Sequence, residues 1–102
     1  MAARSDVIVI ASAKAKPGNG RELERALRDV AKPTRAQPGC VLFSLYRSVE
    51  NPSTIIGFER RARRGDHQRH LQGGHVQKLM SAMAESLAEP PQISSYEIVD
   101  EK

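Results

Sequence analysis

The chain has 102 residues, a length that fits one domain spanning residues 1–102. No apolar run approaches the ~20 residues that a membrane-spanning helix needs, so we expect no membrane partner. The formal net charge is +4, but aromatic residues make up only 4% of the chain and Trp is absent. These are too few aromatic side chains for a base-stacking surface, so we expect no nucleic-acid partner.

Residues 7–13 read Val-Ile-Val-Ile-Ala-Ser-Ala, a β-rich and nearly continuous apolar run. The run follows Arg4 and could pass for a signal-peptide core, but it is short and has no persuasive cleavage site, so we interpret it as a strand. The single cysteine, Cys40, cannot form a disulfide within the chain, which favours a cytoplasmic protein. We expect Cys40 to be a small buried residue rather than a nucleophile.

A helix is predicted from Arg21 to Ala31, because apolar residues recur there at the spacing of one helical face. Pro33 lacks the amide hydrogen that would bond to Asp29, so the helix should kink or end at this point. Cys40 to Arg47 and Thr54 to Arg60 are the next predicted strands, and the turn residues between them predict a hairpin.

In the second half of the chain, the sequence pattern predicts a short helical piece around Asp66 to Leu71 and a corner at Gly73 and Gly74. A longer helix is predicted from about His75 to Ala88. Pro90 ends that helix, and a last strand covers Ile93 to Val99. The order is β-α-β-β-(α)-α-β, which predicts a ferredoxin-like α+β fold with an antiparallel sheet. Helices would cover one face of the sheet, and the other face also carries enough apolar residues to need a cover.

Two histidines flank the predicted corner, His70 and His75. In one continuous helix, residues five apart would point about 140° away from each other, which excludes a two-histidine zinc arrangement with ligands at i and i+4. No cluster of Cys, Asp, Glu and His has metal-ligand spacing, and no phosphate loop or dinucleotide fingerprint is present, so we expect no metal and no cofactor.

The residues Phe58-Glu59, His70-Leu71-Gln72 and His75-Val76-Gln77-Lys78-Leu79 resemble the antibiotic biosynthesis monooxygenase family. That family usually has a strand ending Glu-x-Trp, a short helix, and His-Leu-Gln-Thr-Pro-His opening a longer helix. Arg61 stands in place of the usual Trp, Gly73-Gly74 in place of Thr-Pro, and His67 in place of a usually apolar residue. The resemblance implies two sheets paired face to face in a homodimeric α/β barrel.

The resemblance also implies a cofactor-independent monooxygenase that oxidises a quinol or another phenolic, polyketide-type aromatic with O₂. His75 would lie beside the apolar stripe at a helix N-terminus, where a neutral imidazole is favoured. His70 lies four residues after Asp66, whose carboxylate could orient the imidazole as a general base. Each histidine also has an ordinary interpretation: His75 as a helix cap, and His70 as a half-exposed residue beside a surface carboxylate.

Arg60, Arg61, Arg63 and Arg64 form a basic cluster, which is most simply a solvated rim. Only Arg61 has a functional interpretation, because it shares a strand face with Glu59 and could neutralise a phenolate or enolate. Phe43, Phe58 and Met80 have the pattern of core residues, and with Arg61 they are the side chains that we expect to line a substrate pocket.

Two other functions remain open at this point. The arginine cluster and the absent Trp also suit an isomerase acting on a small phosphorylated or polyhydroxy carbonyl compound. A non-catalytic dimeric ligand-binding module is the third possibility. Haem degradation is not expected. The haem-degrading branch of the superfamily that this chain resembles has an Asn on the first strand and a His in the last helix, but residues 7–13 contain no Asn and Met80 stands at the position of the His.

Overall fold

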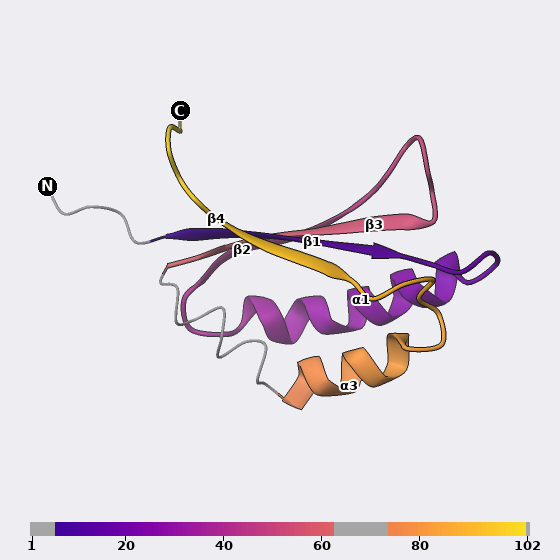
Figure 1. The fold of residues 1–102 in the computed structure, drawn as a ribbon. Helices are drawn as coiled ribbons and strands as arrows, with labels where there is room; N and C mark the ends of the chain where they lie inside the picture. The colour runs from indigo at the N-terminus through magenta and orange to yellow at the C-terminus, as the bar shows by residue number, and fades with distance from the viewer. Residues whose placement is uncertain (1–5, 63–73, 102) are drawn as a thin grey trace, which may run out of the picture.

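A computed structural model describes residues 6–62 and 74–101 of the chain. The described elements are β1 (Val7–Lys14), α1 (Gly20–Arg35), β2 (Cys40–Arg47), β3 (Thr54–Arg61), α3 (Gly74–Met83) and β4 (Gln92–Glu97). The strands form one antiparallel sheet in the order β2-β3-β1-β4, and both helices lie on the same side of it (Figure 1). This arrangement confirms the predicted ferredoxin-like α+β fold.

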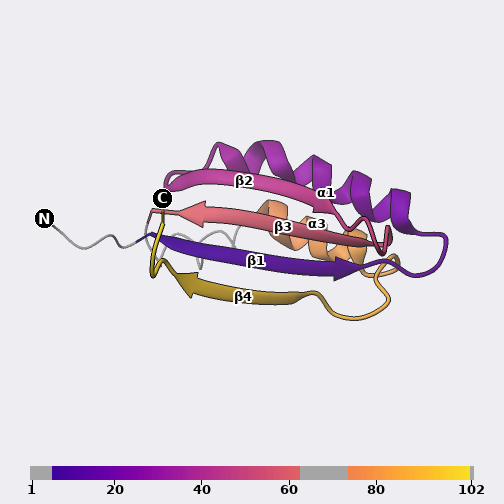
Figure 2. The same ribbon diagram turned by 90° about the horizontal axis from the view of Figure 1, so that it is seen from above.

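The two helices divide the covered side of the sheet between them. Helix α1 runs along the β2 edge, and α3 lies beneath the middle of the sheet (Figure 2). Neither of the two described helices is long and apolar enough to cross a membrane. The packed core lies between this helical layer and the sheet, and Leu23 of α1, Ile55 of β3 and Met83 of α3 are buried together in it.

Strand alternation sorts the sheet residues onto two unequal faces. Buried residues on the helix side include Val9, Phe43 and Ile55. The other face has no covering layer within the described residues, yet it carries a belt of half-buried or exposed apolar side chains. The belt consists of Ile8, Ile10, Leu42, Tyr46, Ile56, Phe58 and Tyr96, and we call it the open apolar face.

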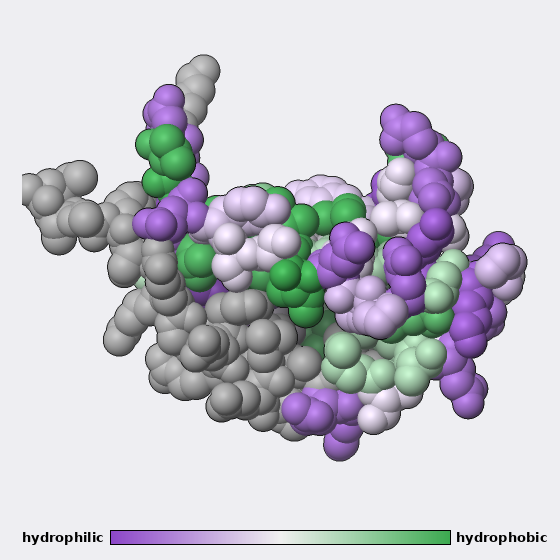
Figure 3. All heavy atoms as spheres, viewed as in Figure 1, coloured by the Kyte–Doolittle hydropathy of each residue, from purple (hydrophilic) through white to green (hydrophobic). Residues whose placement is uncertain are grey.

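Two segments rise on either side of the open apolar face. One is the hydrophilic turn between β2 and β3, and the other is the C-terminal segment after β4 (Figure 3). Arg60 holds the second segment in place: its Nε donates to Asp6 Oδ2 at 2.7 Å and its Nη1 to Glu101 Oε2 at 2.9 Å. One guanidinium thus ties the segment before β1 to the segment after β4.

The helix boundaries differ from the predicted ones in two places. Helix α1 continues through Pro33 to Arg35, so of the two predicted outcomes, a kink or an end at that proline, the end is wrong. The missing amide hydrogen costs one bond, but Val30, Ala31 and Thr34 in the same turns are buried, and this burial keeps the last turn helical.

Helix α3 ends at Met83, five residues before the predicted end at Ala88. The reason is competition for the backbone: Ala88 N–H donates to Lys14 O and Lys16 N–H to Ser86 O, both at 2.8 Å. Leu87 forms an isolated bridge with Ala15. Pairing with the chain that follows β1 therefore replaces the last predicted turn of helix.

Candidate functional site

The end of β3 places Glu59 and Arg61 side by side on the covered face, because residues two apart on a strand share a face. Arg61 is 0% exposed and Glu59 is 6% exposed. Arg61 and its neighbour Arg60 are therefore not part of a solvated rim: Arg61 is in the interior, and Arg60 is largely buried on the opposite face. Arg63 and Arg64 lie outside the described residues.

A short network holds the Arg61 guanidinium in one orientation. Its Nε donates to Glu59 Oε2 at 3.0 Å, and its Nη2 lies 2.9 Å from the same oxygen. Nη2 also donates to Gln37 Oε1 at 3.1 Å, which links β3 to the segment that follows α1. A buried charge needs such pairing, because an isolated ion in the interior would cost several kcal/mol, of order the desolvation penalty for one ion.

Two buried polar atoms have no hydrogen-bond partner in the described part of the chain. They are Nη1 of Arg61 and Oγ1 of Thr34, and Thr34 is 0% exposed. Thr34 is also joined to Gln37, because Gln37 N–H donates to Thr34 O at 3.2 Å. Buried polar atoms are rarely left unpaired in native proteins, so these two are the natural contacts for a polar ligand atom or a water molecule.

Cys40 opens β2 opposite Arg61 in the sheet register. Its side chain is half-buried and packs against the cluster of Val30, Ala31 and Phe43. Burial raises the pKa of the Cys40 thiol, with smaller opposing effects from the Arg61 charge. A thiol with a raised pKa is a poor nucleophile, which agrees with the expected packing role.

The structure separates the residues that the sequence grouped into one pocket. Phe43 is buried on the same face as Arg61 and pairs with Glu59 in the register. Phe58 lies on the open apolar face, so Phe58 and Arg61 do not line one pocket within the subunit. Met80 is 41% exposed on α3, so the expected core packing of Met80 is wrong, and Met83 of the same helix is buried.

The predicted acid–base residues fall at the limits of what the structure describes. Asp66, His67 and His70 lie outside the described residues. The backbone of His75 is in the first turn of α3, close to the predicted helix start, and nothing is described of its side chain. Among the described residues no group of three or more His, Cys, Asp or Glu side chains is placed to hold a metal ion.

Sequence reasoning missed Gln37 as a partner of Arg61, and it missed the burial of Thr34, whose backbone carbonyl accepts from Gln37. Gln37 follows a helix whose predicted end was uncertain, and Thr34 reads only as the last member of the apolar stripe of α1. The contact between Gln37 and Arg61 joins residues 24 positions apart, and no local pattern signals it. Arg61, at a position where the family usually has Trp, was the sequence feature that indicated a polar group in the interior.

Three comparisons with known proteins bear on this arrangement. A family model described as antibiotic biosynthesis monooxygenase matches residues 6–82. A curated protein of Synechocystis, the uncharacterized protein sll1783, is 24% identical over 94 residues. That match covers 92% of this chain and 64% of the relative, so the chain spans somewhat less than two thirds of the length of that protein.

Solved structures superpose over nearly the whole chain. Rv0793 from Mycobacterium tuberculosis is 29% identical with a TM-score of 0.88, covering 95% of this chain and 98% of its own. A protein from Nitrosomonas europaea, named as a candidate antibiotic biosynthesis monooxygenase, is 20% identical with a TM-score of 0.89 over 97% of this chain and 95% of its own. At that identity the second likeness concerns the fold alone.

Proposed function

Because the chain belongs to the antibiotic biosynthesis monooxygenase family, we propose that it oxidises a quinol or another phenolic aromatic with O₂, without a bound cofactor. The observation that carries this proposal is the family match across residues 6–82, which includes the strand with Glu59 and Arg61 and the start of α3. The finer parts of the proposal rest on the chemistry of individual side chains.

The reaction needs a base, an electron-rich anion and a dry pocket. In our proposal His70 or His75 removes a phenolic proton, with Asp66 orienting His70. The resulting anion donates electrons to O₂ and a carbon–oxygen bond forms. The histidine returns its proton to the peroxide. Loss of water, which takes that proton and the hydrogen of the attacked carbon, leaves one oxygen atom in the product as a carbonyl and the other in water.

Arg61 is the residue that we propose as the anion stabiliser. Its guanidinium is buried, fixed by Glu59 and Gln37, and keeps Nη1 without a partner among the described residues. A preoriented charged donor in a water-poor site is worth far more to a developing oxyanion than the same donor in water. Phe43 on the same face supplies an apolar neighbour for an aromatic ring.

Oxygen consumption tests this proposal directly. The wild-type protein, stripped of metals with a chelator, is mixed with a panel of naphthoquinols and phenolic polyketides, and O₂ uptake is followed against the spontaneous rate. We expect uptake above that rate for at least one phenol, with the methyl ether of the same phenol inert. Ligand binding without O₂ uptake would favour a binding module, and turnover of a phosphorylated carbonyl compound would favour an isomerase.

We further infer that the protein is a homodimer in which the open apolar faces of two sheets meet. Tyr46 is 56% exposed and Tyr96 49% exposed on this face, and the isoleucines of the face lie on β1 and β3, the two strands between them. Pairing with a second copy would remove these apolar side chains from water, which favours a dimer. The β2–β3 turn and the segment after β4 flank this face and leave its middle open to a partner sheet (Figure 3).

Replacing Phe58 with glutamate is expected to convert the dimer to a monomer at micromolar concentration, because it places two unpaired carboxylates in the centre of the interface. Light scattering coupled to size-exclusion chromatography measures the mass. Val49→Glu is the control, because Val49 is 88% exposed in the turn between β2 and β3 and is not one of the side chains of the open apolar face. A Phe58→Glu protein that kept the mass of the Val49→Glu protein would refute this interface.

A further inference from the structure

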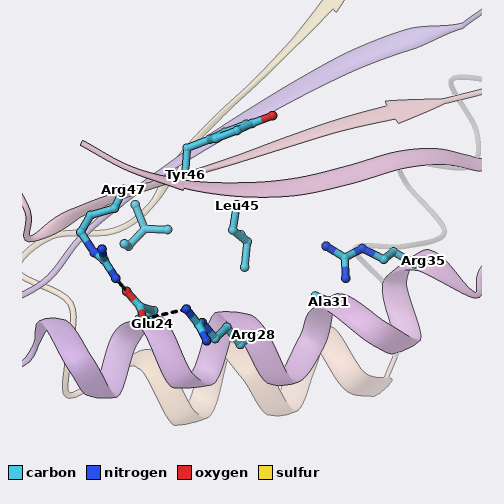
Figure 4. A pocket seen from close by; sticks show the side chains of 8 residues that line it. Glu24, Arg28, Ala31, Arg35, Leu45, Tyr46 and Arg47 are labelled. Carbon is cyan, nitrogen blue, oxygen red and sulfur yellow. Dashed lines mark hydrogen bonds and ion pairs between the residues drawn. The ribbon is translucent and has the colours of Figure 1, made fainter. Parts of the chain in front are cut away.

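A second feature lies on the helical side of the sheet, between α1 and β2. Helix α1 and the edge strand β2 enclose a cleft of about 440 Å³ (Figure 4). Ile55 lines this cleft, and Arg61 is six residues further along the same strand. Six residues of strand span about 20 Å, so the Ile55 end of the cleft is far from Arg61, and only the Arg35 end comes near Phe43.

Positive charge dominates the walls of the cleft. Arg28 and Arg35 of α1 and Arg47 of β2 line it, and they face a single carboxylate, Glu24. Arginine guanidinium groups match carboxylate and phosphate oxygens in shape as well as charge. The chain as a whole has a net charge of +4, so this one cleft, with three arginines and one glutamate, contains a substantial share of the excess.

Glu24 shows where an oxyanion fits in the cleft. Its carboxylate is bound by Arg47 Nη2 through Oε1 and by Arg28 Nη2 through Oε2, the latter at 3.3 Å. Both arginines are substantially exposed, with side-chain exposures of 71% for Arg28 and 52% for Arg47, so an incoming anion can reach them. The intramolecular carboxylate therefore occupies the position that a ligand anion would share or take over.

Arg35 stands at the other end of the cleft with its guanidinium aimed along it (Figure 4). Its Nε donates to Phe43 O at 3.1 Å and its guanidinium carbon lies 6.0 Å from the centre of the Phe43 ring, which fixes the group in place. Among the described residues no carboxylate forms an ion pair with Arg35. Its terminal nitrogens are available to an anionic group.

Three apolar side chains form the floor of the cleft between these charges, and Leu45 is the part-exposed one. Leu45 points from β2 toward α1 between Arg47 and Arg35 (Figure 4). Ile55 and Ala31 also line the space. A bare inorganic anion would leave this floor uncovered, whereas a ring or short hydrocarbon attached to the anion would cover it and gain about 25 cal/mol per Å² of apolar surface removed from water.

We propose that this cleft is a binding site for a small amphiphilic anion, that is, an aromatic or alicyclic body with one phosphate or carboxylate group. The oxyanion binds Arg47 and Arg28 in competition with Glu24, and the apolar body lies on Leu45 toward Arg35. The anion contacts use neither Arg61 nor the two histidines, so this site does not depend on the proposed function.

The test is a titration of isotopically labelled protein followed by NMR, with 1-naphthyl phosphate, inorganic phosphate and 1-naphthol as probes. We expect saturable shifts at Leu45, Arg47 and Ile55 with 1-naphthyl phosphate. Inorganic phosphate should bind at least about tenfold more weakly, because it leaves the apolar floor bare. 1-Naphthol, which lacks the anion, should not shift these residues. Equal affinity for inorganic and naphthyl phosphate would overturn the proposed ligand class.

Two variants with opposite expected effects make the test independent of folding. Arg47→Gln should weaken naphthyl phosphate binding about tenfold or more, because it removes one cation and leaves Glu24 with a single partner. Glu24→Gln should tighten it at least threefold, a gain that a misfolded protein cannot give. Lys32→Gln, an exposed charge removal on the same helix but outside the cleft, is the matched control. A Lys32→Gln loss equal to that of Arg47→Gln, or no gain with Glu24→Gln, would refute the site.

Discussion

Replacing Arg61 with methionine is expected to lower the free energy of unfolding by about 3–5 kcal/mol, the range for removing one partner of a buried ion pair. Methionine keeps the apolar stem and most of the volume, so the effect is one of charge. Glu59, 6% exposed, would be left with a buried carboxylate that has lost both guanidinium contacts. Denaturation by urea, followed by circular dichroism, measures the change.

The double variant Glu59→Gln with Arg61→Met is the control for this interpretation. Replacing both members of a buried pair by neutral groups is often close to neutral, so the double variant should recover most of the lost stability. It should also fail to oxidise the phenolic substrate, because the anion stabiliser is absent. A double variant as unstable as Arg61→Met would show that Arg61 contributes through packing and not through the ion pair.

Replacing His70 and His75 together with asparagine is expected to lower phenol-dependent O₂ consumption by about 10²–10⁴-fold, the usual contribution of a positioned general base. Each single variant identifies its own share, and the residue whose loss accounts for the whole effect is the base. The pH dependence gives a second measurement: a neutral histidine base loses activity as the pH falls through its pKa, so the wild-type rate should decline on the acid side.

His67→Asn provides the comparison, because His67 belongs to the same stretch of sequence and is expected to be a surface residue. Its rate should match that of the wild type. Unchanged O₂ consumption in the double variant, with stability also unchanged, would remove both histidines from the mechanism and leave Arg61 as the one candidate from the proposed set that acts on the anion.

The strands were well predicted because their signal is local. β2 occupies Cys40–Arg47, the predicted range, and β3 extends one residue beyond its predicted end. Both are bounded by turn residues and rich in β-branched or aromatic side chains, which act over a few positions. The order of elements then fixed the ferredoxin-like topology, since few other arrangements connect these elements without crossing.

The helix ends were harder to predict because tertiary contacts decide them. The burial of Thr34 outweighs the proline one residue before it, and a strand-like pairing with Lys14 shortens α3. Lys14 is far in sequence from Ala88, to which it bonds, and the burial of Thr34 exists only in the folded chain. Sequence pattern gives the existence of a helix more securely than its last turn.

The candidate site was predictable where it depends on local strand alternation and not where it depends on tertiary contacts. Glu59 and Arg61 share a face through simple alternation, and the sequence predicted that pair. The assignment of Phe58 to the same pocket conflicted with this alternation, because Phe58 is an odd number of positions from Arg61. The role of Gln37 in fixing the Arg61 guanidinium depends on the path of the chain after α1, which no local sequence pattern specifies.

Arg60 has a consequence for engineering this fold. Asp6 and Glu101 bind the same guanidinium, so the two ends of residues 6–101 meet at one side chain. A short glycine-rich linker could therefore close the backbone into a ring, and the ring could be reopened between Asn51 and Pro52, in the exposed turn. Such a rearranged chain would keep every strand neighbour of the sheet while moving its free ends to the opposite rim, where a reporter could be attached.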